Sequence, residues 1–170
     1  EGISRFKNSK GGTMANTKIL AGKRVLIVDD EPDVLEALEE TLDMCEIDTS
    51  IEYEKAKQLL ESKSYDIAVL DIMGVNGYEL LAAANRKGIP AIMLTAHALS
   101  ADNFAKSMDE GACAYLPKDR LFEIDVFLTD VLEDGFKNRG LLGKWFGRLK
   151  GYYENKFGPG WLDEYKGAWQ

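Results

Sequence analysis

The chain has 170 residues, a net charge of −8 and 45% hydrophobic residues, a composition typical of one well-buried globular domain with a short extension. It contains one histidine, which excludes any site that needs two imidazoles, and two cysteines that form no CxxC pair, so neither a disulfide framework nor a Cys-rich zinc site is expected. No apolar run is long enough to span a membrane, and the first twenty residues lack the apolar stretch of a signal peptide. We therefore expect a cytoplasmic protein.

The charge is distributed unevenly along the chain. Residues 136–170 contain seven basic and three acidic residues, a net charge of +4, which leaves −12 for residues 1–135. All three tryptophans also lie in the basic segment. A body with this much negative charge repels phosphates, so we expect no direct binding to nucleic acid. The change in composition predicts a boundary near residue 136.

The chain is expected to consist of a mobile arm (1–22), a folded domain (23–135) and a basic, aromatic helical tail (136–170). The arm is polar and has no periodicity, whereas in the domain short apolar runs alternate with stretches of helical spacing. The expected strands are 25–28, 47–53, 67–70, 91–94 and 112–116, followed in turn by helices at 32–45, 55–62, 77–87, 100–110 and 121–132. Strands without polar alternation must be covered on both faces. The predicted fold is therefore α/β, a doubly wound (βα)5 domain with a five-stranded parallel sheet and a C-terminal amphipathic helical extension.

Polar residues follow four of the five expected strands, at the point where each strand ends. They are Asp29, Asp30, Asp71, Thr95 and Lys118. Ligands of such sheets bind outside the carboxyl ends of the strands, so we expect these side chains to gather at one edge. Three carboxylates packed together need a cation, and oxygen donors without His or Cys favour Mg²⁺. Asp29 and Asp30 have an alternative role as caps of the first helix.

A hydroxyl and an ammonium group beside a metal are what a phosphoryl group requires, since they supply a hydrogen-bond donor and a counter-charge. The chain has no glycine-rich phosphate loop, because neither GxGxxG nor GxxxxGK[ST] occurs. We therefore expect the phosphoryl group to be carried on the protein, by a carboxylate that acts as the nucleophile.

Four stretches, in this order, resemble the receiver domain of two-component response regulators, the CheY-like superfamily: VLIVDDEP, IAVLDIM followed by GVNGYELL, AIMLTAHA and GACAYLPK. The resemblance covers about residues 23–135 and implies a flavodoxin-like fold. It also implies a metal site in which Asp30 binds Mg²⁺ directly and Asp29 largely through water. Asp71 and the backbone carbonyl of Met73 would complete the protein's share of the metal shell.

The resemblance further implies that Asp71 is the phosphoacceptor and attacks a phosphohistidine on a sensor histidine kinase or phosphotransfer protein. Thr95 would hydrogen-bond the phosphoryl oxygen, and Lys118 would pair with it. Tyr115 would be an aromatic switch that swings inward as Thr95 is drawn to the phosphate. Such a protein belongs to a two-component or phosphorelay system and signals through protein contacts. It would catalyse its own phosphorylation and slow hydrolysis, so it is not an enzyme with an external substrate.

Two departures from the family pattern leave an alternative open. The loop after Asp71 is short and lacks the family's proline, and Pro117 precedes Lys118 instead of following it. Neither change removes a reactive group, but a degenerate receiver that acts as a phosphorylation-independent scaffold or dimerisation module is the alternative. Two other classes rank lower. A haloacid-dehalogenase-like phosphatase needs a second aspartate where Met73 stands, and a flavin binder needs a phosphate-cradling loop.

The tail is too short for a DNA-binding output domain. Residues 141–157 carry a wide aromatic face when placed on a helical wheel, and Gly143, Gly147 and Gly151 fall on the polar side. Trp161, Tyr165 and Trp169 recur at a spacing of four and continue the aromatic ridge. Such a helix needs a surface to dock on. The candidates are the chain's own acidic receiver, a second copy or partner protein bound through 137–170, and, ranked last, an anionic membrane surface.

Overall fold

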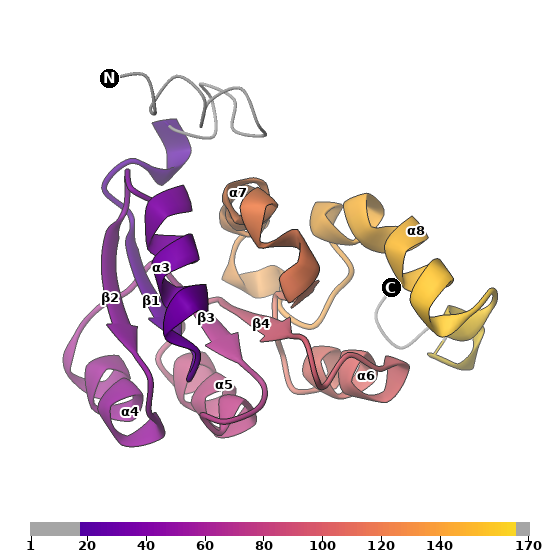
Figure 1. Cartoon of the computed structure of the whole chain (residues 1–170), viewed down its shortest axis with the longest axis horizontal. Helices are drawn as coiled ribbons and strands as arrows, with labels where there is room; N and C mark the ends of the chain where they lie inside the picture. The colour runs from indigo at the N-terminus through magenta and orange to yellow at the C-terminus, as the bar shows by residue number, and fades with distance from the viewer. Residues whose placement is uncertain (1–17, 166–170) are drawn as a thin grey trace.

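Five parallel strands form a single sheet in the order β2-β1-β3-β4-β5 in the computed structural model, which describes residues 18–165 (Figure 1). The strands are β1 (Arg24–Val28), β2 (Glu46–Ser50), β3 (Ile67–Asp71), β4 (Ala91–Thr95) and β5 (Ala114–Pro117). Every residue of β3 and β4 is buried, as predicted from their uninterrupted apolar runs. The order of the strands places β2 and β5 at the two edges of the sheet.

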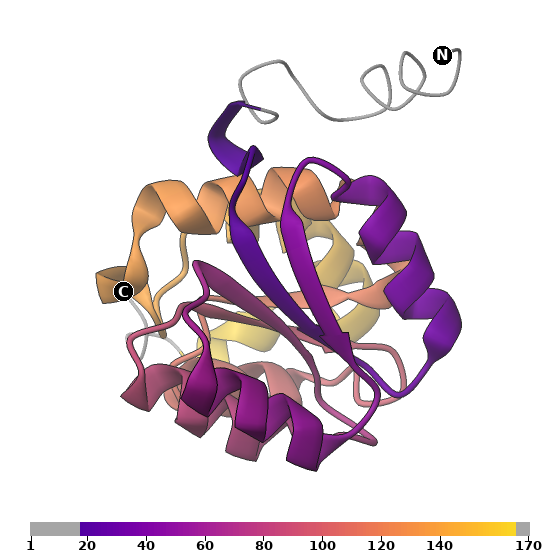
Figure 2. The ribbon, with the colours of Figure 1, turned by 90° about the vertical axis from the view of Figure 1, so that its left-hand side faces the viewer.

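Helices cover both faces of the sheet, which confirms the predicted doubly wound α/β fold. The α-helices are α3 (Pro32–Thr41), α4 (Tyr53–Ser62), α5 (Gly77–Arg86), α6 (Ala101–Asp109), α7 (Ile124–Asp134) and α8 (Lys144–Phe157), and the 3₁₀ helices are η1 (Lys118–Glu123), η2 (Phe136–Asn138) and η3 (Trp161–Tyr165). Helices α3 and α7 lie on one face, and α4, α5 and α6 lie on the other (Figures 1 and 2). None of the helices within residues 18–165 is both long and apolar enough to cross a membrane.

Several element ends differ from the predicted ones. The second strand ends at Ser50 instead of Tyr53, because the Ser50 hydroxyl accepts a hydrogen bond from the Glu52 amide (3.1 Å) and donates one to the Glu52 carbonyl (2.7 Å). This local turn leaves Ile51 55% exposed and lets α4 begin at Tyr53. The predicted cap of α6 is confirmed, since the Ser100 hydroxyl accepts a hydrogen bond from the Asn103 amide at 3.0 Å.

The predicted arm is part of the folded domain at its inner end. Leu20 is completely buried, and its carbonyl oxygen lies 3.4 Å from the Cys45 sulfur. The Gly22 amide donates a hydrogen bond to the Met44 carbonyl at 2.9 Å, so these residues close over the start of the sheet. The remainder of the predicted arm, residues 1–17, lies outside the described residues.

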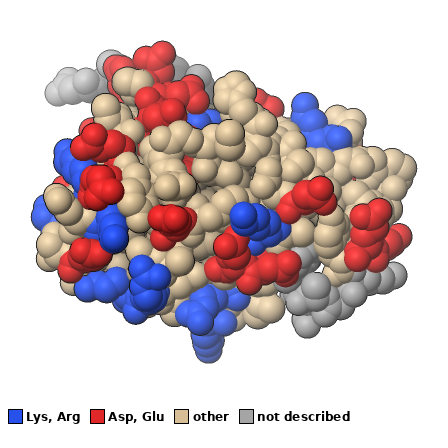
Figure 3. All heavy atoms as spheres, turned by 90° about the horizontal axis from the view of Figure 1, so that it is seen from below, with Lys and Arg blue, Asp and Glu red and all other residues tan. Residues whose placement is uncertain are grey.

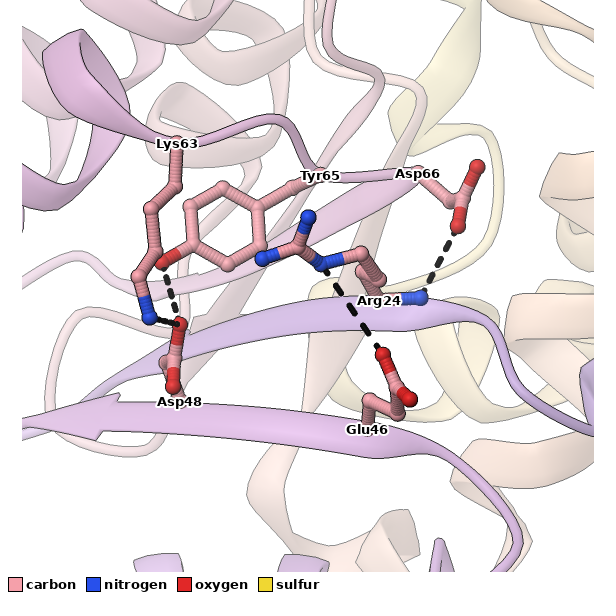
Figure 4. Close-up of polar contacts among 6 residues, drawn as sticks. All are labelled: Arg24, Glu46, Asp48, Lys63, Tyr65 and Asp66. Atoms are coloured by element: carbon pink, nitrogen blue, oxygen red, sulfur yellow. Dashed lines mark hydrogen bonds and ion pairs between the residues drawn. The ribbon is translucent and has the colours of Figure 1, made fainter.

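Polar residues of β1, β2 and the segment before β3 form hydrogen bonds and ion pairs with one another (Figure 4). Asp48 accepts hydrogen bonds from the Tyr65 hydroxyl at 2.7 Å and the Lys63 ammonium at 3.0 Å, and these contacts lower the pKa of Asp48. Asp66 accepts a hydrogen bond from the Arg24 amide at 2.8 Å. Asp48, Lys63 and Asp66 are therefore engaged in structural contacts.

The tail packs against the chain's own folded domain, the first of the three surfaces considered. Its helix α8 begins at Lys144 instead of residue 141, because Gly143 has an extended backbone. Figure 1 shows α8 beside α6 and α7, at the edge of the sheet remote from β2. Its buried residues are Trp145, Phe146, Leu149 and Tyr153. Gly147 and Gly151 have open space where a Cβ would be, so they face away from the folded domain, as the wheel predicted. The prediction is wrong for Gly143, where a Cβ would collide with the carboxylate of Asp134. Trp169 lies outside the described residues.

Phe104 of α6 is the centre of this contact. Its ring centroid lies 5.0–6.0 Å from those of four aromatic residues of the tail, namely Trp145, Phe146, Tyr153 and Trp161. An ion pair supports the contact, because the Arg148 guanidinium binds both carboxylate oxygens of Asp130 on α7, at 2.6 and 3.1 Å. Aromatic pairs of this kind contribute about 0.5–1.5 kcal/mol each beyond the burial of area. The basic, aromatic tail thus packs on the acidic domain around one buried aromatic residue, Phe104.

Figure 3 shows the molecule from below the view of Figure 1, with acidic and basic side chains interspersed over this face. The negative charge of the domain is therefore mixed with cations here instead of forming a continuous acidic face.

We expect Phe104→Ala to lower the free energy of unfolding by about 3–5 kcal/mol, because Phe104 is completely buried between the domain and the tail. Phe122→Ala is the matched control. Phe122 is 63% exposed, so the same substitution should change stability by less than about 0.5 kcal/mol. Urea denaturation of both variants measures the difference, and equal losses would contradict the central role of Phe104.

Candidate functional site

The polar residues that follow the strands meet at the carboxyl edge of the sheet, as predicted. Asp29 follows β1, Asp71 ends β3 and Thr95 ends β4. The register pairs Thr95 with Pro117 at the end of β5, so Lys118 emerges just beyond them. The Lys118 ammonium lies 2.8 Å from Asp29 Oδ2 and 3.1 Å from Asp71 Oδ1.

Lys118 has a third carboxylate partner that the sequence analysis did not identify. Its ammonium also lies 3.0 Å from Glu31 Oε1. Burial by itself would lower the pKa of Lys118, but its ion pairs with Asp29 and Glu31 and the nearby charge of Asp71 raise the pKa above the ordinary value of a lysine. The ammonium therefore keeps its charge at neutral pH. The only sequence signal for Glu31 was its position directly after two aspartates.

The two neighbouring aspartates have different environments. Asp29 is completely buried, and its Oδ1 accepts a hydrogen bond from the Glu31 amide at 2.9 Å. Asp30 is exposed and lines a cavity of about 210 Å³. The N-cap of α3 is Glu31, without a side-chain cap, so the alternative role of Asp29 or Asp30 as the helix cap is wrong.

The cavity has the donor set of a magnesium site. It is lined by Asp30, Glu31, Asp71, Met73, Thr95, Ala96, His97 and Lys118. One carboxylate oxygen from each of Asp29, Asp30 and Glu31 lies within 4.8 Å of the others. Oxygen ligands without sulfur suit Mg²⁺, which keeps several waters and shares its shell with phosphate. The residues present therefore fit this ion, and His97 is an exposed residue on the rim.

Two glycines make the short loop after Asp71 possible. Gly74 has a φ of +86°, and a Cβ at this position would collide with the carboxylate of Asp30. A Cβ at Gly77 would collide with the carbonyl oxygen of Asp71. Asn76 between them adopts the left-handed conformation with a φ of 57°. Although the loop is short, it packs directly against Asp30, and Met73 lines the cavity.

Burial raises the pKa of Asp71 to about 6, and the negative charge of Asp29 adds to this effect. The attraction of Lys118 opposes both. Burial also raises the pKa of Asp29, against its hydrogen bond to Lys118. The site therefore has more negative charge than its single ammonium neutralises, which is a further reason for a cation to bind there.

The two residues expected to form the switch lie next to each other in the structure. Thr95 is buried on the wall of the cavity, and Tyr115 of β5 is completely buried. The Tyr115 hydroxyl donates a hydrogen bond to the Ala98 carbonyl at 3.0 Å and accepts one from the Ser100 amide at 3.2 Å. Both partners belong to the segment between β4 and α6, so the ring of Tyr115 is directed inward in this structure.

Comparison with known proteins agrees with this geometry. Residues 25–130 match the response regulator receiver domain family. The chain is 36% identical over 107 residues to the two-component response regulator ARR18 of Arabidopsis thaliana, a match that covers 59% of this chain and 17% of that protein. It is 34% identical over 105 residues to the transcriptional regulatory protein TcrA of Mycobacterium tuberculosis, which covers 58% of this chain and 41% of TcrA.

Solved structures show the same fold. A CheY-like receiver domain protein from Methanospirillum hungatei is 28% identical with a TM-score of 0.56, and the match covers 68% of this chain and 100% of that one. A Francisella receiver domain has a TM-score of 0.60 at 20% identity, covering 66% of this chain and 98% of that one, and at this identity the likeness concerns the fold alone.

The chain belongs to the response regulator receiver domain family. It spans less than half the length of the curated relatives described above, and its match to the family ends before the tail. The family therefore accounts for the domain and its acidic site, and the tail needs a separate explanation.

In protein stripped of divalent metal, we expect Asp71→Asn to raise the free energy of unfolding by about 1–3 kcal/mol at pH 7. The pKa of Asp71 is raised from 3.8 to about 6 in the folded state, so the folded protein loses stability as the pH rises between these values. The gain from the substitution should therefore disappear near pH 4. Urea denaturation at both pH values measures it, with Asp66→Asn, an exposed position at the other end of β3, as the control. A gain that does not depend on pH would contradict the raised pKa.

Gly74→Ala should weaken Mg²⁺ binding at least about tenfold, because the new methyl group must displace the carboxylate of Asp30. The control is Gly88→Ala, which pays the same conformational cost at a φ of +71° but meets no atom within 4 Å. Calorimetric titration with Mg²⁺ compares the two variants. Equal affinities would show that the close approach of the loop to Asp30 has no role in metal binding.

Proposed function

We propose that this chain is a phosphoacceptor response regulator, in which Asp71 takes a phosphoryl group from a phosphohistidine on a sensor histidine kinase or phosphotransfer protein. The observation that carries the proposal is the placement of Asp71 and Lys118. Asp71 and Thr95 line one cavity, and a charged ammonium lies 3.1 Å from Asp71 Oδ1. A nucleophile, a hydrogen-bond donor and a counter-charge for the phosphoryl oxygens are thereby present together.

The chemistry uses the ionised form of Asp71. One of its carboxylate oxygens attacks the phosphorus, an O–P bond forms, the P–N bond to the donor imidazole breaks, and the imidazole leaves with its electron pair. Lys118 and Thr95 then bind the phosphoryl oxygens. The signal ends by hydrolysis, in which water attacks the phosphorus, inorganic phosphate is released and the Asp71 carboxylate is restored.

Asp29, Asp30 and Asp71, together with the backbone carbonyl of Met73, would hold Mg²⁺, and Glu31 is an additional acidic donor beside them. When bound, the ion supplies positive charge that offsets the excess of carboxylates and the charge of the phosphoryl group. The chain's own Lys118 would exchange some of its carboxylate partners for phosphoryl oxygens.

The signal is expected to leave the site through Thr95 and Tyr115 and to be read by protein contacts. We include in the proposal that the protein acts in the cytoplasm, binds no nucleic acid directly and catalyses no reaction on an external substrate. A degenerate receiver that serves as a scaffold remains the alternative, motivated by the short loop after Asp71. Gly74 and Gly77 let this loop pack closely against its neighbours, and the cavity beside Asp71 is still open. The open cavity favours the phosphoacceptor over the scaffold.

We expect acetyl phosphate with Mg²⁺ to add one phosphoryl group to the protein, and Asp71→Asn to abolish this labelling. Asp66→Asn is the control, because Asp66 directly precedes the first residue of β3, far from the site, and accepts a hydrogen bond from the Arg24 amide. Intact mass spectrometry measures the labelling. Retained labelling in Asp71→Asn would move the acceptor elsewhere, and no labelling of the unmodified chain would favour the scaffold.

A further inference from the structure

The tail contacts the same strand that carries the expected switch residue. The Tyr153 hydroxyl of α8 donates a hydrogen bond to the backbone carbonyl of Tyr115. Tyr115 lies in β5, the edge strand of the sheet, whose outer carbonyls have no neighbouring strand to bind. The tail therefore binds a backbone group of Tyr115 that the sheet itself leaves open.

The aromatic side chains of this contact also enclose the Tyr115 ring. Its centroid lies 5.3 Å from that of Phe104 and 6.0 Å from that of Tyr153, and Tyr115 has no exposed surface. Tyr153 is itself completely buried. Because these side chains occupy the outer side of β5, the Tyr115 ring cannot turn outward while α8 is docked.

A second contact links the tail to the other end of the site. The Tyr152 hydroxyl donates a hydrogen bond at 2.9 Å to the carboxylate of Asp119, which directly follows Lys118 in η1. Two adjacent tyrosines of α8 thus contact Tyr115 and Asp119, which lie before and after the lysine of the site in the chain. The docking of α8 is in this way coupled to the position of β5 and the start of η1.

We propose that the C-terminal segment 144–165 is an intramolecular ligand of the switch, which holds Tyr115 inward so that docking of α8 and phosphorylation of Asp71 favour one another. This inference rests on the proposed function, in which phosphorylation draws Thr95 toward the phosphoryl group and Tyr115 follows it inward. Coupling between two binding events is reciprocal. A docked tail should therefore strengthen the binding of a phosphoryl group, and a bound phosphoryl group should tighten the docking of the tail by the same factor.

The test compares two full-length variants that each place a new aspartate on α8. Leu149→Asp puts it at a completely buried position and should undock the tail, whereas Asn155→Asp puts it at an exposed position. Binding of fluoroberyllate with Mg²⁺, which imitates the phosphoryl group, is measured by calorimetry. We expect roughly tenfold weaker binding for Leu149→Asp, within the usual range of coupling between sites, and unchanged binding for Asn155→Asp.

The reciprocal effect is measured by amide hydrogen exchange in the unmodified chain. Fluoroberyllate should slow exchange across 144–157. Equal or tighter binding by Leu149→Asp, or faster exchange of α8 on addition of fluoroberyllate, would overturn the proposal, and the latter would show that the tail is released by phosphorylation.

Amide hydrogen exchange of the Leu149→Asp variant itself shows whether β3 and β4 remain protected in that protein. If they do not, Tyr153→Phe replaces it, since this variant keeps the ring and removes only the bond to the Tyr115 carbonyl. We expect it to weaken fluoroberyllate binding less than Leu149→Asp but in the same direction, and unchanged binding would overturn the proposal. Failure of the unmodified chain to bind fluoroberyllate would instead refute the proposed function itself.

Discussion

A single ammonium group among three carboxylates is the interaction on which the rest of the site depends. Lys118 lies within 3.1 Å of oxygen atoms of Asp29, Glu31 and Asp71. Burying two of these acids costs free energy that the ion pairs only partly offset, because the pKa values of both Asp29 and Asp71 remain raised. A site with an uncompensated negative charge and an open cavity is suited to a cation, and a bound cation would in turn favour the binding of phosphoryl oxygens.

Strand β5 connects this site with the tail, which lies outside the match to the family. Its carboxyl end delivers Lys118 to the cavity, and its outer edge receives the Tyr153 hydroxyl. An edge strand exposes backbone groups that other segments can bind, and most proteins protect them. Here the protection comes from a helix whose aromatic side chains also enclose Tyr115, so the same contact covers the edge strand and restrains the ring that we propose as the switch.

The local sequence was sufficient to predict most of the elements, because strand and helix periodicities depend on residues close in the chain. The cap at Ser100 and the buried strands β3 and β4 are examples. The boundary of the predicted arm was wrong because contacts from distant residues decide it. The local sequence places Leu20 in a polar arm, whereas its packing near Cys45 makes it part of the core.

The sequence by itself determined the fold class and the convergence of Asp29, Asp71, Thr95 and Lys118, because parallel strands have their carboxyl ends at one edge and each of these residues lies at such an end. It also determined that the tail has one aromatic face. Only the tertiary structure decided that Glu31 shares the Lys118 ammonium and that the aromatic face covers β5. Both depend on which distant surfaces meet in space, and a helical wheel specifies the face of a helix without specifying the surface that it packs against.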